Sequence, residues 1–211
     1  MPFVHWPLFD LTLVTPRVTL RLPNDVELSA LADVAAAGIH SPASMPFELP
    51  WTDVPAPLLQ RNFLQFHWGA RAGFSLTSWS LDLAVFYEGR PLGVQSLMAT
   101  DFATHRTVKT CSWLGRNAQG QGLGKEMRRA VLALAFDGLG AESALSNSFV
   151  DNRASRRVSE ALGYEVFGEE IKSPRGEAAL STVFKLERSA WKPFNGYRIE
   201  GLEGCQEMFG A

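Results

Sequence analysis

The chain has 211 residues, of which 46% are hydrophobic and 20% charged, and its formal net charge is -2. This length and composition predict a single globular domain with a full hydrophobic core. The slightly negative charge provides no broad basic surface for nucleic acid. Two cysteines, Cys111 and Cys205, form neither a disulfide framework nor a metal-binding cluster, so we expect no metal. Cys111 is expected to be a small buried residue of a core strand.

The start of the chain shows no targeting signal. Residues 1–9 lack the charged start and long apolar run of a signal peptide. No apolar stretch approaches the roughly 20 residues that a bilayer-spanning helix needs. We therefore expect a cytoplasmic protein with no membrane partner.

The first quarter of the chain predicts an arm, a strand, a helix and a loop. Residues 1–12 are apolar and aromatic with two prolines, as in an extended arm packed on the domain or at a dimer contact. Residues 17–22 alternate as a strand, and Asn24 provides a cap for a helix over about 25–38. Residues 41–57 contain five prolines, which predict a loop that either faces substrate or covers the core.

The next stretch predicts a helix over 57–72 and then a β-hairpin over 80–88 and 91–99. His67 and Arg71 are four residues apart and therefore share a helix face. This pair is either a solvated edge or a cationic site for the free carboxylate of a dicarboxylic donor.

Residues 108–136 begin with strand-like alternation, pass through a glycine-rich turn and end as a helix with Arg128 and Arg129 at polar positions. Such a turn presents unpaired backbone N–H groups at the positive end of the helix dipole. It predicts a phosphate cradle, and the alternative is an ordinary strand-to-helix turn.

The spacing of the glycines distinguishes between known phosphate cradles. A P-loop requires lysine after Gly120, where Gln121 stands, and the dinucleotide fingerprint fails because Lys125 occupies its third glycine position. The pattern that fits is Q-x-x-G-x-G, formed by Gln119, Gly122 and the glycine at 124.

A second stretch, residues 145–167, predicts a strand, a helix and another strand. Asn152 is a good N-cap residue, and Gly163 ends the helix. An antiparallel pair over 164–170 and 178–187 should close the sheet.

Together the two stretches resemble the GNAT superfamily of acyl-CoA N-acyltransferases, in which Q-x-x-G-x-G precedes Asn-x-x-Ser, here Asn152 and Ser155, and a helix closing at Leu-Gly-Tyr. The resemblance implies an α+β fold: a mixed, mostly antiparallel sheet with a splay between two parallel strands, flanked by helices. It implies one domain over residues 1–190. The aromatic residues of 191–211 predict an ordered C-terminal extension.

The branch of the superfamily is also indicated. Residues 15–21 resemble the first strand of the RimJ/RimL-like group, which acylates protein N-termini and other amines. Residues 5–11 and 45–51 resemble a RimL-like member associated with succinyl-CoA. The resemblance implies acetyl-CoA or succinyl-CoA as co-substrate and a small-molecule or protein amine as acceptor. The aromatic terminal segments predict a homodimer.

The resemblance implies that backbone N–H groups of the glycine turn bind the pyrophosphate and that the pantetheine arm fills the splay. The cofactor-binding residues it implies are Trp113, Leu114, Gln119, Gly120, Gln121, Gly122, Leu123, Gly124, Lys125, Asn152, Ser155 and Arg156. The acceptor and acyl pocket is expected at Phe47, Trp51, His67 and Arg71.

The family's usual acid and base are missing. Ser159 stands at the spacing of the tyrosine that protonates the leaving thiolate, and 109–112 lacks the strand glutamate. Ser155 is the expected proton donor, and Asp101 the expected base ahead of His105. The expected mechanism is direct attack by a bound amine. Two alternatives are an acyl-CoA-binding sensor that has lost catalysis and, more remotely, a nucleotide-phosphate enzyme.

Overall fold

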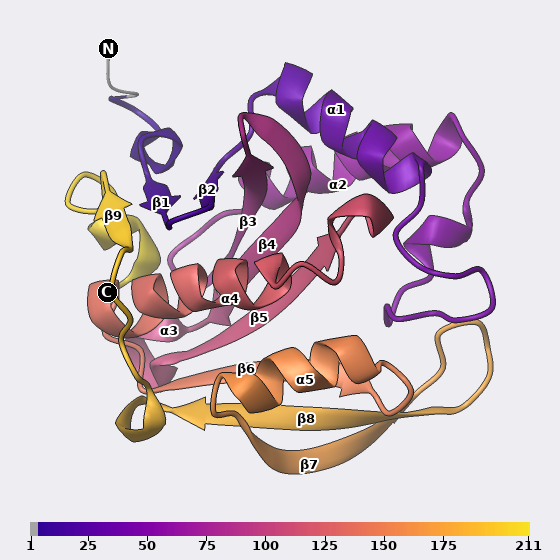
Figure 1. The fold of residues 1–211 in the computed structure, drawn as a ribbon. Helices are drawn as coiled ribbons and strands as arrows, with labels where there is room; N and C mark the ends of the chain where they lie inside the picture. The colour runs from indigo at the N-terminus through magenta and orange to yellow at the C-terminus, as the bar shows by residue number, and fades with distance from the viewer. Residues whose placement is uncertain (1–3) are drawn as a thin grey trace.

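The computed structural model describes residues 4–211. Its centre is a nine-stranded sheet in the order β7-β8-β6-β5-β4-β3-β2-β1-β9 (Figure 1). One neighbouring pair, β5 and β6, is parallel, and the others are antiparallel. The strands are β1 (Thr12–Val14), β2 (Val18–Arg21), β3 (Ser78–Tyr87), β4 (Arg90–Thr100), β5 (Thr107–Leu114), β6 (Ser143–Phe149), β7 (Glu165–Lys172), β8 (Ala179–Glu187) and β9 (Arg198–Glu200).

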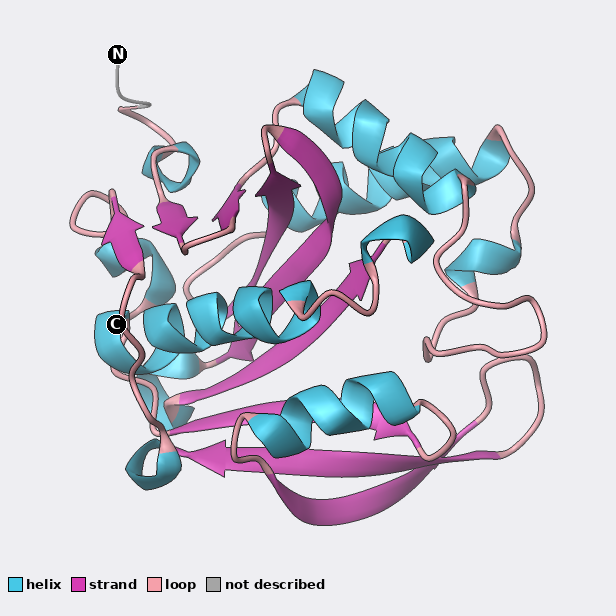
Figure 2. Ribbon diagram, viewed as in Figure 1, coloured by secondary structure: helices cyan, strands magenta, loops and turns pink. Residues whose placement is uncertain are grey.

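Helices cover both faces of the sheet (Figures 1 and 2). The helices are α1 (Asp25–Ala36), α2 (Leu58–Ala72), α3 (Phe102–His105), α4 (Leu123–Ala133) and α5 (Arg153–Ala161), and a π-helical turn over Leu134–Gly138 prolongs α4. Leu28 and Leu31 of α1 pack with Val94 on one face, which we call the α1/α2 face. Met127 and Val131 of α4 belong to the core on the other, the α4/α5 face. The expected α+β sandwich is confirmed.

Capping residues fix where two of these helices begin. Asn24 Oδ1 accepts the Glu27 N–H at 2.9 Å, and the Glu27 carboxylate accepts the Asn24 N–H at 2.9 Å. This reciprocal pair is a capping box. At α5, Asn152 Oδ1 accepts the Ser155 N–H at 3.2 Å. The predicted caps at both positions are therefore confirmed.

The parallel pair separates partway along its length. Pairing runs from Thr107 opposite Ser143 to Thr110 opposite Ser146, and no further pair joins these two strands. Both strands continue, β5 to Leu114 and β6 to Phe149. The expected splay is confirmed, and its closed end lies just before Cys111.

Segments near both ends of residues 4–211 lie at one edge of the sheet. Residues 7–9 form a 3-10 turn and 12–14 form β1, so this part of the expected extended arm is folded. Residues 1–3 of that arm lie outside the described residues. Near the C-terminus, β9 pairs with β1. Asp137 accepts hydrogen bonds from Trp191 Nε1 at 3.0 Å and Tyr197 Oη at 2.8 Å, which attach the C-terminal segment to the end of the α4 region. Within residues 4–211, every helix is too short or too polar to cross a bilayer.

Candidate active site

The turn between β5 and α4 has the geometry of an anion-binding site. Gly120 and Gly122 have φ of +74° and +79°, a region that L side chains rarely adopt. Gly122 is the N-cap of α4. Within residues 4–211, no backbone acceptor receives the N–H groups from Gly120 to Lys125. A Cβ at Gly120 would meet nothing within 4 Å. The turn therefore presents free donors at the positive end of a helix, as phosphate binding requires.

The glutamine side chains of the turn brace it from within. Gln119 Nε2 donates to the carbonyl oxygens of Ile39 and Leu114 at 2.7 and 2.8 Å. Gln121 Nε2 donates to the carbonyl oxygen of Asn117 at 2.9 Å. These bonds hold the path of the backbone and leave its N–H groups available.

One cation beside the turn was missed by the sequence analysis. Arg17 Nε donates to Glu126 Oε2 at 2.6 Å, and its Nη1 donates to the carbonyl oxygen of Gln121 at 3.0 Å. Its Nη2 would lie 3.5 Å from a Cβ at Gly122. The only signal in the sequence is the position of Arg17 at the start of the first predicted strand. Lys125, an expected cofactor-binding residue, is exposed at the start of α4.

Buried polar atoms without partners gather around the splay on the α4/α5 face. Among residues 4–211 they include Gln95 Oε1 on β4, Ser148 Oγ on β6, Arg128 Nε on α4 and Ser159 Oγ on α5. Buried polar atoms are nearly always satisfied, so each such exception needs an explanation. A polar chain such as the pantetheine arm, with its amides and thioester, would supply partners here. The residues present therefore fit an acyl-CoA.

The predicted residues of α5 lie in different surroundings. Asn152 caps the helix, and Ser155 is half-buried in its first turn. Arg156 turns to the sheet: its Nη1 donates to Thr182 Oγ1 at 3.0 Å, and its guanidinium lies 5.7 Å from the centre of the Phe184 ring. The structure thus places Asn152 and Ser155 at the start of α5, whereas the Arg156 head group lies against β8.

Aromatic side chains line the α1/α2 face beside the splay. Trp51 lies 5.2 Å from Phe47, 5.9 Å from Phe63 and 5.9 Å from Trp113, between ring centres. Phe63 and Trp113 are 5.8 Å apart. The loop residues Phe47 and Trp51 therefore both pack on the core and border the end of β5. The core-covering interpretation of this loop is confirmed, and its contact with substrate stays a prediction.

The expected cationic pair on α2 is occupied within the fold. Arg71 Nη2 donates to the carbonyl oxygen of Pro23 at 2.5 Å, and its Nη1 lies 3.4 Å from Asp25 Oδ1. His67 is 4% exposed, so a solvated edge is wrong for this residue. Burial lowers the pKa of His67, Asp82 opposes this shift and Arg71 adds to it.

Asp101 and His105 lie at the opposite end of the strands from the glycine turn. Asp101 follows the last residue of β4, and His105 ends α3 before β5 begins. β5 then runs from Thr107 to Cys111 at the closed end of the splay, about 13 Å along the strand. The proton-transfer role of Asp101 and His105 stays a prediction. His105 lines a cavity of about 730 Å³ on the α1/α2 face with Lys109.

A row of polar side chains crosses the α1/α2 face to the splay. Asp82, Ser96 and Cys111 are register partners on β3, β4 and β5. Ser96 Oγ donates to Asp82 Oδ1 at 2.5 Å, while the buried Asp82 Oδ2 has no partner. The sequence analysis missed Asp82, whose signal was a carboxylate among the apolar residues of β3. The expectation of a buried Cys111 is wrong: the residue is exposed, because it lies where β6 no longer covers the edge of β5.

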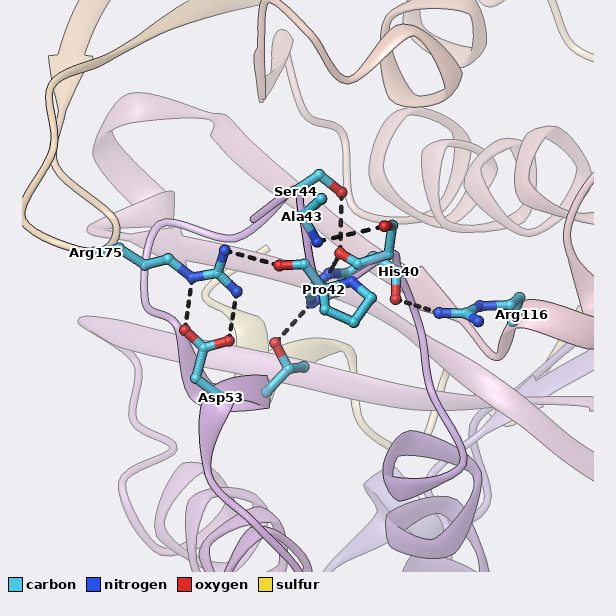
Figure 3. A network of polar contacts seen from close by, with 9 residues as sticks. His40, Pro42, Ala43, Ser44, Asp53, Arg116 and Arg175 are labelled. Carbon is cyan, nitrogen blue, oxygen red and sulfur yellow. Dashed lines mark hydrogen bonds and ion pairs between the residues drawn. The ribbon is translucent and has the colours of Figure 1, made fainter.

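Ionic contacts join the two loops that flank the open end of the splay (Figure 3). Arg175, between β7 and β8, forms a bidentate pair with Asp53 at 2.7 and 2.6 Å and donates to the carbonyl oxygen of Pro42 at 3.1 Å. Lys172 Nζ lies 3.1 Å from Glu48 Oε1. We call these contacts, from Arg175 and Lys172 to the 41–57 loop, the clasp.

The arrangement provides backbone donors for an anion, unpaired polar atoms along the splay and a cavity on the second face of the sheet. Among residues 4–211, no cluster of His, Cys, Asp and Glu is able to hold a metal ion.

Comparison with known proteins identifies this arrangement. Residues 17–165 match the model of the acetyltransferase (GNAT) domain. A GCN5-related N-acetyltransferase from Brucella melitensis superposes with a TM-score of 0.68 at 19% identity, covering 85% of this chain and 80% of that one. The GNAT-family acetyltransferase from Bacillus anthracis gives 0.67 at 15% identity, covering 84% and 99%. RimL, a ribosomal L7/L12 alpha-N-protein acetyltransferase in complex with coenzyme A, gives 0.66 at 15% identity, covering 82% and 96%. The family match spans more than half of the sequence, and the chain belongs to the GNAT acetyltransferases.

Proposed function

We propose that this protein transfers an acyl group from a coenzyme A thioester to a primary amine by direct attack. The observation that carries the proposal is the Gly120–Lys125 turn, whose free N–H groups open α4 beside a splayed parallel pair. The thioester supplies an activated acyl carbon. The protein binds and orients it, while the aromatic α1/α2 face excludes water from one side.

Within this proposal each part of the site has one task. The turn holds the pyrophosphate through backbone donors, and the unpaired polar atoms along the splay bond the pantetheine arm. Ser155 lies in the first turn of α5, where it would bond the departing sulfur. The amine approaches from the α1/α2 face, between the row that ends at Cys111 and the clasp.

The donor is acetyl or succinyl, and the two differ by a free carboxylate. Arg71 is held by Pro23 and Asp25, and His67 is buried, so neither is free for that carboxylate. We therefore propose acetyl as the donor group. Lys109 is exposed two residues from Cys111 and forms no ion pair within residues 4–211, so it is the cation that a succinyl carboxylate would meet. If succinyl-CoA were preferred, Lys109→Gln should lose that preference and Arg71→Gln should retain it.

The proposed acceptor is a small-molecule amine or a protein amine. The homodimer stays a separate prediction. The clasp spans the entrance on the acceptor side, which supports a slender acceptor. A panel of polyamines, amino acids and short peptides would distinguish these acceptors through CoA release.

Two measurements test the function. Saturation at about 100 times Kd should stabilise the fold by about 2.7 kcal/mol, which raises Tm by about 5–10 °C for a chain of this size. CoA and acetyl-CoA should produce this shift and ATP should not. Thiol release from acetyl-CoA that depends on an amine then separates the enzyme from the alternative, an acyl-CoA sensor. Binding without amine-dependent release would favour the sensor, and absence of binding would refute both.

A further inference from the structure

A buried cation lies at the closed end of the splay without an acidic partner. Arg128 is 4% exposed on the inner side of α4. Its Nη1 donates to Ser146 Oγ at 2.9 Å and its Nη2 to Ser112 Oγ at 3.1 Å, while its Nε has no partner in the described part of the chain. The ion pairs found within residues 4–211 all involve other cations.

The two serines place this guanidinium at the point where the strands part. Ser146 belongs to the last pair of β5 and β6, opposite Thr110. Ser112 is the next residue of β5 on the same face, and it has no β6 partner. Arg128 therefore bridges the strands from the α4/α5 face at the base of the splay.

Neighbouring titratable groups do not neutralise this charge. Burial raises the pKa of Tyr164, which lies near Arg128 and Thr110. Desolvation by the surrounding strands also raises the pKa of Cys111, although that residue is partly open to solvent. Both groups are neutral at pH 7. A buried cation without a counter-charge is costly, and proteins rarely retain one except where another charge is to be met.

We infer that Arg128 is a catalytic residue that stabilises the departing CoA thiolate in the acyl transfer proposed above, on which this inference rests. The amine nitrogen forms a bond to the acyl carbon with its lone pair. The C–S bond then breaks, and its electron pair stays on sulfur. The proton that nitrogen loses is the one that sulfur finally gains, so the products are an amide and free CoA thiol.

The position of Ser159 explains why such a cation is needed. Ser159 stands where the family has the tyrosine that protonates the thiolate, and it is fully buried. A serine hydroxyl is a far weaker acid than a thiol, whose pKa is about 8.5 in cysteine. A cation next to sulfur makes the thiolate a better leaving group without donating a proton first, because it lowers the energy of the charged product.

The test measures the acidity of the CoA thiol on the enzyme. Ultraviolet absorbance of the thiolate is followed against pH for CoA bound to the full chain, with dethio-CoA, which lacks the thiol, as the blank for protein groups. We expect the bound thiol to titrate at least about one unit below free CoA, a tenfold change in acidity. Arg128→Gln should abolish the shift, and Arg128→Lys should retain part of it. Arg129→Gln removes the same charge from the next position of α4 and should leave the shift intact.

Activity provides a second reading. Arg128→Gln should lower kcat about tenfold or more, and this loss should exceed any loss of acetyl-CoA affinity, because the guanidinium acts mainly on charge that develops during the reaction. An unshifted thiol in the wild-type protein overturns the inference even if the variant fails to fold. Equal shifts in wild type and Arg128→Gln overturn it as well. If CoA and acetyl-CoA do not bind to the wild type, the proposed function fails and this inference fails with it.

Discussion

Gly122 and Gly124 should respond in opposite ways to the same substitution. Gly122 has φ of +79°, whereas Gly124 lies within the regular helix α4. A Cβ at Gly122 would come no closer than 3.5 Å to Arg17 Nη2, and one at Gly124 would lie 3.9 Å from Val158 Cγ2. Neither alanine causes a steric clash, so the difference between them is backbone strain alone.

The magnitude follows from the left-handed conformation. An L residue at such a φ costs about 1–2 kcal/mol. In Gly122→Ala this cost is divided between a loss of fold stability and a loss of CoA affinity. If the turn keeps its shape, the fold loses the full amount, and Tm falls by about 2–4 °C per kcal/mol. If the turn relaxes, the fold loses little, but CoA must restore the shape and binds up to about 5- to 30-fold more weakly. Gly124→Ala should bind CoA normally and gain about 0.5–1 kcal/mol of stability.

Thermal unfolding and calorimetric titration with CoA, run on both variants, measure the two losses together. Their sum for Gly122→Ala should reach about 1–2 kcal/mol. Equal stability and equal CoA affinity in the two variants would refute the assignment of this turn as a strained phosphate cradle.

Three further predictions concern individual side chains. Ser155→Ala should lower kcat by about 10- to 100-fold while acetyl-CoA affinity stays unchanged in calorimetry; a loss confined to affinity would show that the hydroxyl serves binding only. Burial lowers the pKa of His67, so below about pH 6.5 the unfolded chain binds a proton at this residue more readily than the folded chain does, and the stability of the fold should decrease as the pH decreases through that range. His67→Gln should flatten this part of the plot of Tm against pH. An unchanged slope of Tm against pH in the variant would assign the effect to other groups. Hydrogen bonding to Arg175 lowers the pKa of Asp53, so the ion pair of the clasp is intact above about pH 3.9 and is lost as the pH falls through the lowered pKa. NMR titration of the Asp53 carboxyl should give a higher pKa in Arg175→Gln than in the wild type. An equal pKa in both proteins would mean that the pair does not persist in solution.

Local patterns predicted the elements of this fold well. The alternation of β3 to β5, the cap at Asn24 and the glycine turn each depend on neighbours in the sequence, and the structure confirms them. The GNAT resemblance also gave the splay correctly, because the motifs that define it flank the two parallel strands.

Side-chain environments set by distant segments were harder to predict. Helical periodicity put Arg128 on a polar face, but the splay it reaches is built from two strands that the local pattern does not show meeting. His67 and Arg71 share a face, yet Arg71 donates to the distant Pro23 carbonyl and His67 is buried against the sheet side of α2. Cys111 belongs to a core strand and is still exposed, because its parallel neighbour diverges one residue earlier.

The pairing of β9 with β1 has a consequence for how the chain folds during synthesis. Residues near position 199 pair with residues near 13, so this edge of the sheet is completed only after β9 has been synthesised. Until then, and in any product shortened before β9, the β1 strand offers an open row of amides and carbonyls to passing molecules. Expression tags are therefore better joined through a flexible spacer, and truncation at residue 190 should yield aggregates instead of a smaller enzyme.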